Sequence, residues 1–110
     1  MGTSKTEHFS EYVNRMALIL KAMGHPARLA IIEYLQKVDS CICNDLVNEL
    51  PLAQPTISQH LKELKSADII KGTIEGNSIC YCLNSELFSE LETYFRELKH
   101  QVQSANFKCC

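Results

Sequence analysis

The sequence predicts a mainly α-helical single domain with one β-hairpin, on the basis of three observations. The chain of 110 residues is near the common size of one domain and can bury a modest core. Several segments carry apolar residues at helical spacing. One stretch, DIIKGTIEGNSICYCL, has β character on both sides of the turn residues Glu75-Gly76-Asn77. We expect one domain over residues 1–110, with an ordered core at 9–102 and a cysteine-ended tail at 103–110.

The first two predicted helices are separated by the sequence GHPAR. Residues 9–23 form the first helix, and its segment Met16–Leu20 is apolar on nearly every side, so it requires burial on more than one side. Gly24 is expected to end this helix, His25 to cap the next one, and Pro26 to take its first position. The second helix follows through ARLAIIEYLQKV. Its inward-facing residues are expected to be Leu29, Ile32 and Leu35, with Ile31 beside them.

A pair of closely connected helices comes next. The short helix NDLVNEL, residues 44–50, is stopped by Pro51, and PLA forms a tight connection. A further helix runs from Gln54 to about Ala67, and its buried stripe is Ile57, Leu61 and Leu64. Two helices joined by a three-residue turn and followed at once by a hairpin describe a winged helix-turn-helix.

The last predicted helix runs from about Ser85 to Val102 and has one continuous apolar face. This face consists of Leu87, Phe88, Leu91, Tyr94, Phe95, Leu98 and Val102. The first and last helices are longer and more apolar than a monomer of this size needs. We therefore expect them to form the interface of a homodimer.

The helix that begins at Gln54 is the candidate for reading DNA. Short polar side chains near its start suit base edges, and lysines further along suit phosphates. Pro55 in the first turn leaves the partial positive charge of the helix N-terminus facing the DNA. The predicted DNA-binding residues are Gln54, Thr56, Ser58, Gln59, Lys62, Lys65 and Lys71. A solvated surface helix shows the same pattern, so the preceding turn and the following hairpin are what favour DNA. His60 fits either a packed histidine or a phosphate contact.

Charge and hydropathy restrict the classes of function and the cellular location that the chain can have. The net charge is −2, so DNA contact has to come from a local patch. No apolar run approaches the ~20 residues of a membrane span, and the start of the chain has no signal-peptide core. We expect a cytoplasmic protein whose six cysteines stay reduced, which favours metal binding or redox chemistry over structural disulfides. No pair is CxxC, and no nucleophile–base arrangement is evident, so an enzyme is not expected.

Several motifs resemble one family in the right order, over roughly residues 9–102. LKAMGHPARLAIIEYL looks like the second-helix signature of the ArsR/SmtB family, and LPLAQPTISQHLKELKSADII is similar to its recognition helix with a Ser–x–His–Leu core. GNSICYCL occupies the place of the family's second wing strand. The resemblance implies a homodimeric winged-helix repressor. In this family the ligand-free dimer binds a palindromic operator, and a metal or metalloid lowers its affinity for DNA.

The resemblance also implies where an inducer binds. CICNDL matches the first two thiols of the family's cysteine site, Cys41 and Cys43, but has no third cysteine there. The third sulfur is expected from Cys109 or Cys110 of either subunit. As(III) or Sb(III) suits such a site, with Cd(II) or Pb(II) as alternatives, and no obligatory cofactor is expected. The family's zinc-type site on the last helix is not expected, because that helix offers only Glu86 and His100.

The spacing of the paired cysteines limits what they can do. On a regular helix, residues i and i+2 point apart, so Cys41 and Cys43 can share an ion only if their segment is non-helical or distorted on binding. A distortion there would tilt the following recognition helix and release DNA. Cys80 and Cys82 share one side of a strand at roughly 7 Å, which favours a packing role. The alternative function is a repressor of the same fold that senses oxidants or reactive sulfur.

Overall fold

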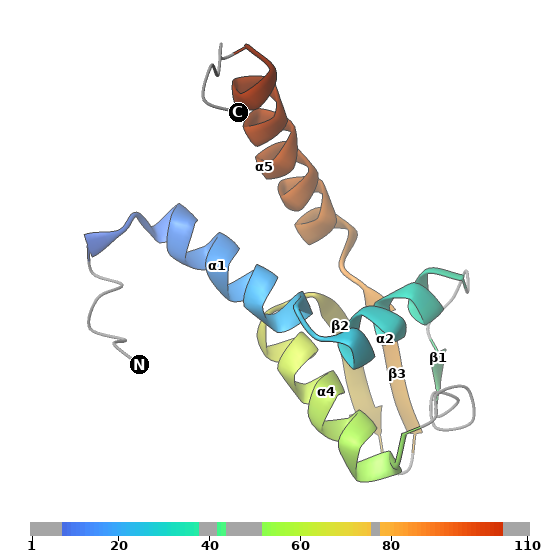
Figure 1. Ribbon diagram of the computed structural model, residues 1–110. Helices are drawn as coiled ribbons and strands as arrows, with labels where there is room; N and C mark the ends of the chain where they lie inside the picture. Colours follow the sequence, from blue (N-terminus) through green and yellow to red (C-terminus); the bar gives the residue numbers. More distant parts are fainter. Residues whose placement is uncertain (1–7, 38–41, 44–51, 76–77, 105–110) are drawn as a thin grey trace.

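A computed structural model describes residues 8–37, 42–43, 52–75 and 78–104, with the element order shown in Figure 1. The order predicted from the sequence is confirmed for the described elements. The helix predicted at 44–50 lies outside the described residues. The elements are α1 (Glu11–Met23), α2 (Pro26–Lys37), β1 (Ile42–Cys43), α4 (Gln54–Ser66), β2 (Ile70–Glu75), β3 (Ser78–Leu83) and α5 (Ser85–Ser104).

The boundary between α1 and α2 is set by local hydrogen bonds. Gly24 caps the end of α1, and its N–H donates to the carbonyl oxygen of Lys21 at 3.3 Å. The N–H of Ala27 donates to Nδ1 of His25 at 3.0 Å, and Pro26 is the first residue of α2. A side-chain acceptor before the first turn and a proline in it are typical helix starts. The roles predicted for all three residues of the GHP sequence are confirmed.

The sheet has three antiparallel strands in the order β1-β3-β2. The predicted hairpin is confirmed: β2 pairs with β3 from Ile70 opposite Leu83 to Glu75 opposite Ser78. The strand β1 was not predicted, and it adds Ile42 opposite Tyr81 and Cys43 opposite Cys80. Ile42 and Cys43 themselves are therefore extended rather than helical.

One hydrophobic core joins α1, α2, α4, the sheet and the start of α5. The predicted stripe of α4 is confirmed, with Ile57, Leu61 and Leu64 exposed by only 2%, 6% and 0%. On α2 the residues Ile31, Ile32 and Leu35 are buried. The prediction that Leu29 faces inward is wrong, because 44% of its surface is exposed. Positions 29 and 31 lie roughly 200° apart around a helix, and the side that holds Ile31 is the one that packs inward.

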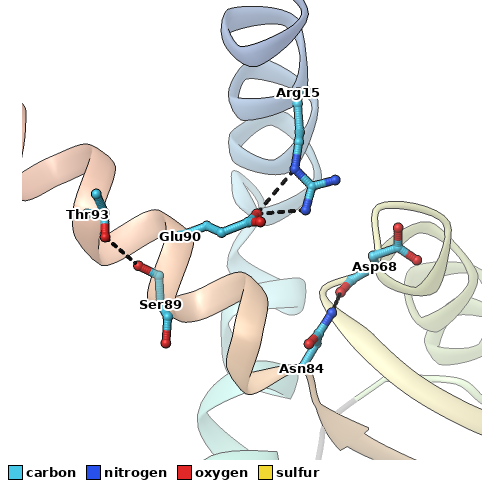
Figure 2. Close-up of polar contacts among 6 residues, drawn as sticks. All are labelled: Arg15, Asp68, Asn84, Ser89, Glu90 and Thr93. Carbon is cyan, nitrogen blue, oxygen red and sulfur yellow. Dashed lines mark hydrogen bonds and ion pairs between the residues drawn. The ribbon is translucent and has the colours of Figure 1, made fainter.

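The end of α4 is fixed by a left-handed residue. Asp68 has a φ of 62°, and its N–H donates to the carbonyl oxygen of Lys65, while the N–H of Ile69 donates to that of Leu64. This pattern terminates a helix and turns the chain into the next element. Nδ2 of Asn84, which precedes α5, donates to the carbonyl oxygen of Asp68 at 2.9 Å (Figure 2). The recognition helix, the wing and α5 thus meet at one corner.

The helices α1 and α5 contact each other but leave much apolar surface uncovered. Nη2 of Arg15 on α1 lies 2.7 Å from Oε2 of Glu90 on α5 (Figure 2). The rings of Tyr12 and Tyr94 pack edge to face at 5.9 Å. Figure 1 shows the outer ends of both helices extending beyond the rest of the fold. Large apolar side chains exposed on or next to α1 and α5 are Phe9, Tyr12, Val13, Leu18, Phe95, Leu98 and Val102.

Candidate nucleic-acid interface

The face of α4 opposite its buried stripe is polar and exposed. Thr56, Gln59 and Lys62 are exposed on this face, and Ser58 and Lys65 are exposed on one flank of it. Gln54 is the first residue of α4, and its side chain lies outside the described part of the structure. Because Ile57, Leu61 and Leu64 anchor the other face, the exposed set projects away from the core as a group. The structure therefore brings these predicted contact residues together on one helix.

The first turn of α4 is open to a negatively charged partner. Ala53 precedes the helix and provides no side-chain hydrogen bond, and a proline occupies the first turn. The carbonyl oxygen of Ala53 accepts from the N–H groups of Thr56 and Ile57, each at 3.1 Å. The capping residue Ala53 therefore places no side-chain oxygen against the positive end of the helix dipole, which favours a nearby phosphate.

Among the predicted DNA contacts, Gln59 already has a hydrogen-bond partner and Lys71 lies on the hairpin rather than on α4. Nε2 of Gln59 donates to Oε1 of Glu63 one turn later at 3.2 Å, so Gln59 has to leave this exposed partner to reach a base. Lys71 lies on β2 and is exposed, and its partner across the sheet is Cys82 on β3. Asn77 at the wing tip lies outside the described residues. The wing thus adds one exposed cation to those of α4.

A polar cluster connects the recognition helix to the first two helices. Nε of Arg28 donates to Nδ1 of His60 at 3.1 Å, and Nη1 of Arg28 donates to the carbonyl oxygen of Ala22 at 3.1 Å. The rings of His25 and His60 lie 4.5 Å apart. His60 is therefore a packed histidine here, one of the two roles left open by the sequence. Arg28 was not singled out as a site residue, although the GHPAR motif contained it.

The surroundings of His60 lower its pKa from the ordinary value of 6.5. Burial is the largest cause, followed by the neighbouring His25 and Arg28, while Glu63 acts in the opposite direction. A neutral ring is also what the geometry requires, because Nδ1 must accept the Arg28 proton. The folded state thus disfavours the protonated imidazole.

We expect this histidine to make folding pH-dependent. Below pH ~6.5 the unfolded chain takes up a proton at His60 that the folded chain resists, so stability is present above that pH and falls as the pH drops toward the lowered pKa. The free energy of unfolding is measured by urea denaturation at pH 7.5 and at pH 5.5. The difference between the two values should be smaller for His60→Gln than for the parent. His100→Gln, at an exposed site on α5, is the control. If the free energy of unfolding of His60→Gln changed with pH as much as that of the parent, His60 would not be the source of the pH dependence.

The predicted cysteine ligands stay a prediction. Cys41, Cys109 and Cys110 lie outside the described residues. Cys43 lies in β1 opposite Cys80, and Cys82 is half-buried on β3. Among the side chains that the structure describes, no three of the types His, Cys, Asp and Glu are grouped closely enough to hold a metal ion. Within the same residues, no helix is long and apolar enough to cross a membrane.

Known proteins resemble this chain in sequence and in fold. The family described as "Bacterial regulatory protein, arsR family" matches residues 25–71. An uncharacterized HTH-type transcriptional regulator of Methanocaldococcus jannaschii is 38% identical over 89 residues, which cover 80% of this chain and 99% of that protein. The arsenical resistance operon repressor of Staphylococcus xylosus is 35% identical over 71 residues, covering 64% of this chain and 67% of that repressor.

The fold comparison agrees with the sequence comparison. A crystal structure of an ArsR family transcriptional regulator superposes with a TM-score of 0.77, covering 89% of this chain and all of that one. Its sequence is only 19% identical, so this likeness concerns the fold alone. Its mainly helical architecture with an antiparallel hairpin is that of the winged helix-turn-helix predicted above. The chain therefore belongs to the ArsR/SmtB family of helix-turn-helix transcriptional repressors, and it is a regulator rather than an enzyme.

Proposed function

We propose that this protein is a cytoplasmic homodimeric repressor whose two α4 helices enter successive major grooves of a palindromic operator. The observation that carries the proposal is the exposed polar face of α4, held outward by three core residues of the same helix. Gln54, Thr56, Ser58 and Gln59 would contact base edges. Lys62, Lys65 and Lys71 would contact phosphates, as cations placed beyond a recognition helix start do in this class.

The dimer in this proposal is formed by α1 and α5. Side chains at the outer parts of both helices remain exposed by about half, including Val102 at 59% and Phe95 at 49%. Large apolar side chains left in water on two neighbouring helices favour an interaction site there. A second copy of the chain supplies a matching surface, because a two-fold interface uses the same patch on both subunits.

The inducer in this proposal is a thiophilic metalloid, As(III) or Sb(III), bound by Cys41 and Cys43 with Cys109 or Cys110 of either subunit. Thiolate ligands select soft ions, so Cd(II) and Pb(II) are alternatives. The similarity to a repressor named for arsenical resistance supports the metalloid. The extended backbone at Cys43 supports a non-helical site, which the two thiols need in order to approach one ion. Sensing of oxidants or reactive sulfur by the same thiols is the second candidate.

The test is release of DNA by different inducers. The protein first selects a duplex with an inverted repeat from random sequences. Binding of this duplex, labelled with a fluorophore, is then measured by anisotropy at two salt concentrations. Low-micromolar arsenite or antimonite should release the duplex, whereas zinc and peroxide should not. Cys41→Ser/Cys43→Ser should bind the duplex normally and need at least about tenfold more arsenite for release, a difference of ~1.4 kcal/mol. A full arsenite response in that variant would remove these thiols from the site.

A further inference from the structure

The first strand meets the wing at a pair of cysteines. In the antiparallel pairing of β1 with β3, Cys43 is the direct partner of Cys80. Residues directly opposite each other in such a pair have Cβ atoms about 4.5–5.5 Å apart. Residues two apart on one strand are separated by about 7 Å. The register thus places Cys80 nearer to Cys43 than to Cys82 on its own strand.

The same register places positions 43 and 80 on one face of the sheet, opposite to the face of position 81. Tyr81 is only 5% exposed and belongs to the core face. Alternation along a strand then assigns positions 80 and 82 to the opposite face, and position 43 shares the face of its partner at 80. Cys82 is half-buried there, consistent with a face that solvent reaches.

We propose a different partner for Cys43 than the one given above: Cys43 and Cys80 bind one trivalent arsenic as a dithiolate, in place of Cys41 and a tail cysteine. This inference rests on the proposed thiol-sensing function. Arsenous acid, As(OH)₃, exchanges two hydroxyl groups for the two sulfurs. Two As–S bonds form, two As–O bonds break, and the two thiol protons leave with the hydroxyl groups as two molecules of water. Arsenic keeps its oxidation state and retains one hydroxyl group.

A bridge between β1 and β3 would act on DNA binding through the wing. Cys80 is paired on its other side with Thr73 of β2, and Cys82 is paired with Lys71 of the same strand. Lys71 is the phosphate contact that we assign to the wing. Because hydrogen-bonded strands share one twist, a covalent link at one edge of the sheet changes the course of all three. The bridge thus reaches a DNA contact without involving the recognition helix.

The experiment uses phenylarsine oxide, which loses its oxygen as water when its arsenic bonds to two thiols. The full chain is treated, digested with trypsin without added thiols, and analysed by mass spectrometry. Trypsin separates residues 38–62 from residues 72–96, so an arsenic bridge across β1 and β3 appears as these two peptides joined. Cys41→Ser/Cys82→Ser retains the proposed pair. Cys41→Ser/Cys80→Ser is its matched control, since it retains one cysteine on each strand at the wrong register.

We expect the joined peptides from the parent and from Cys41→Ser/Cys82→Ser, at least about tenfold more than from the matched control, because only the paired positions are close enough to be spanned. The joined product should be lost from the parent in 8 M urea. Equal bridging in the two double variants, or a bridge from residues 38–62 to the tail peptide 109–110 instead, would overturn the assignment. A bridge formed without any release of DNA by arsenite would keep this site and reject the sensing function.

Discussion

Replacing Leu64 with alanine should lower the free energy of unfolding by about 2–5 kcal/mol. Leu64 lies on the inner face of α4 and has no exposed surface. Truncation removes apolar contacts and leaves a cavity beneath the helix that the neighbouring core residues fill only in part. Because a domain is stable by only about 5–15 kcal/mol, this is a large share of the total. Urea denaturation followed by circular dichroism measures the change.

Leu29→Ala is the matched control, since it removes the same atoms from another helix. Leu29 is 44% exposed on α2, so its truncation should cost less than about 1 kcal/mol by the loss of partly buried area. A loss at Leu29 as large as that at Leu64 would mean that Leu29 is covered in the molecule in solution. It would also restore the inward role predicted from the sequence.

Replacing Leu98 with aspartate should separate the proposed dimer while leaving each subunit folded. Leu98 is 44% exposed on α5, within the apolar surface assigned to the second copy. Two like charges facing each other across a two-fold interface oppose association, and burying them adds a desolvation cost. A monomer engages only one half-site, so affinity for the inverted repeat should fall by a factor of about 10²–10⁴. Sedimentation velocity and anisotropy measure the two effects.

Ser89→Asp controls for the added charge. Ser89 is exposed on the same helix, and nine residues of a 3.6-residue turn place it about 180° around the axis from Leu98. This variant should remain dimeric and keep its affinity for the duplex. Should Leu98→Asp instead remain a dimer with unchanged DNA affinity, the interface must lie elsewhere.

The features that the sequence predicts best are those determined by residues close together in the chain. The cap at His25, the proline after it and the stripe of α4 follow from contacts within one or two turns, and all are found in the structure. Leu29 was misplaced because helical spacing alone does not decide which side of α2 packs inward. The buried side holds Ile31, Ile32 and Leu35, and Leu29 lies roughly 200° around the axis from Ile31. No local sequence pattern predicts β1, because a strand of two residues is defined only by its pairing with β3.

The candidate site divides in the same way. The polar face of α4 can be read from the spacing of one helix, so its exposed residues were found before the structure was known. The contact of Arg28 with His60 joins residues 32 positions apart. The pairing of Cys43 with Cys80 depends on the strand register, which no single segment contains. Only the folded chain brings such partners together.

The hydrogen bonds of Arg28 have a consequence for the length of the operator. One guanidinium donates to the end of α1 and to the middle of α4 at once, so a rotation of α4 relative to α1 has to break at least one of these hydrogen bonds. In the proposed dimer, the two α4 helices are therefore held at a constant separation. An extra base pair between the half-sites turns one of them by roughly 35° around the duplex, given about 10.5 base pairs per turn. We therefore expect the proposed dimer to lose affinity when one base pair is added between the half-sites, so that it detects helical phase as well as base identity.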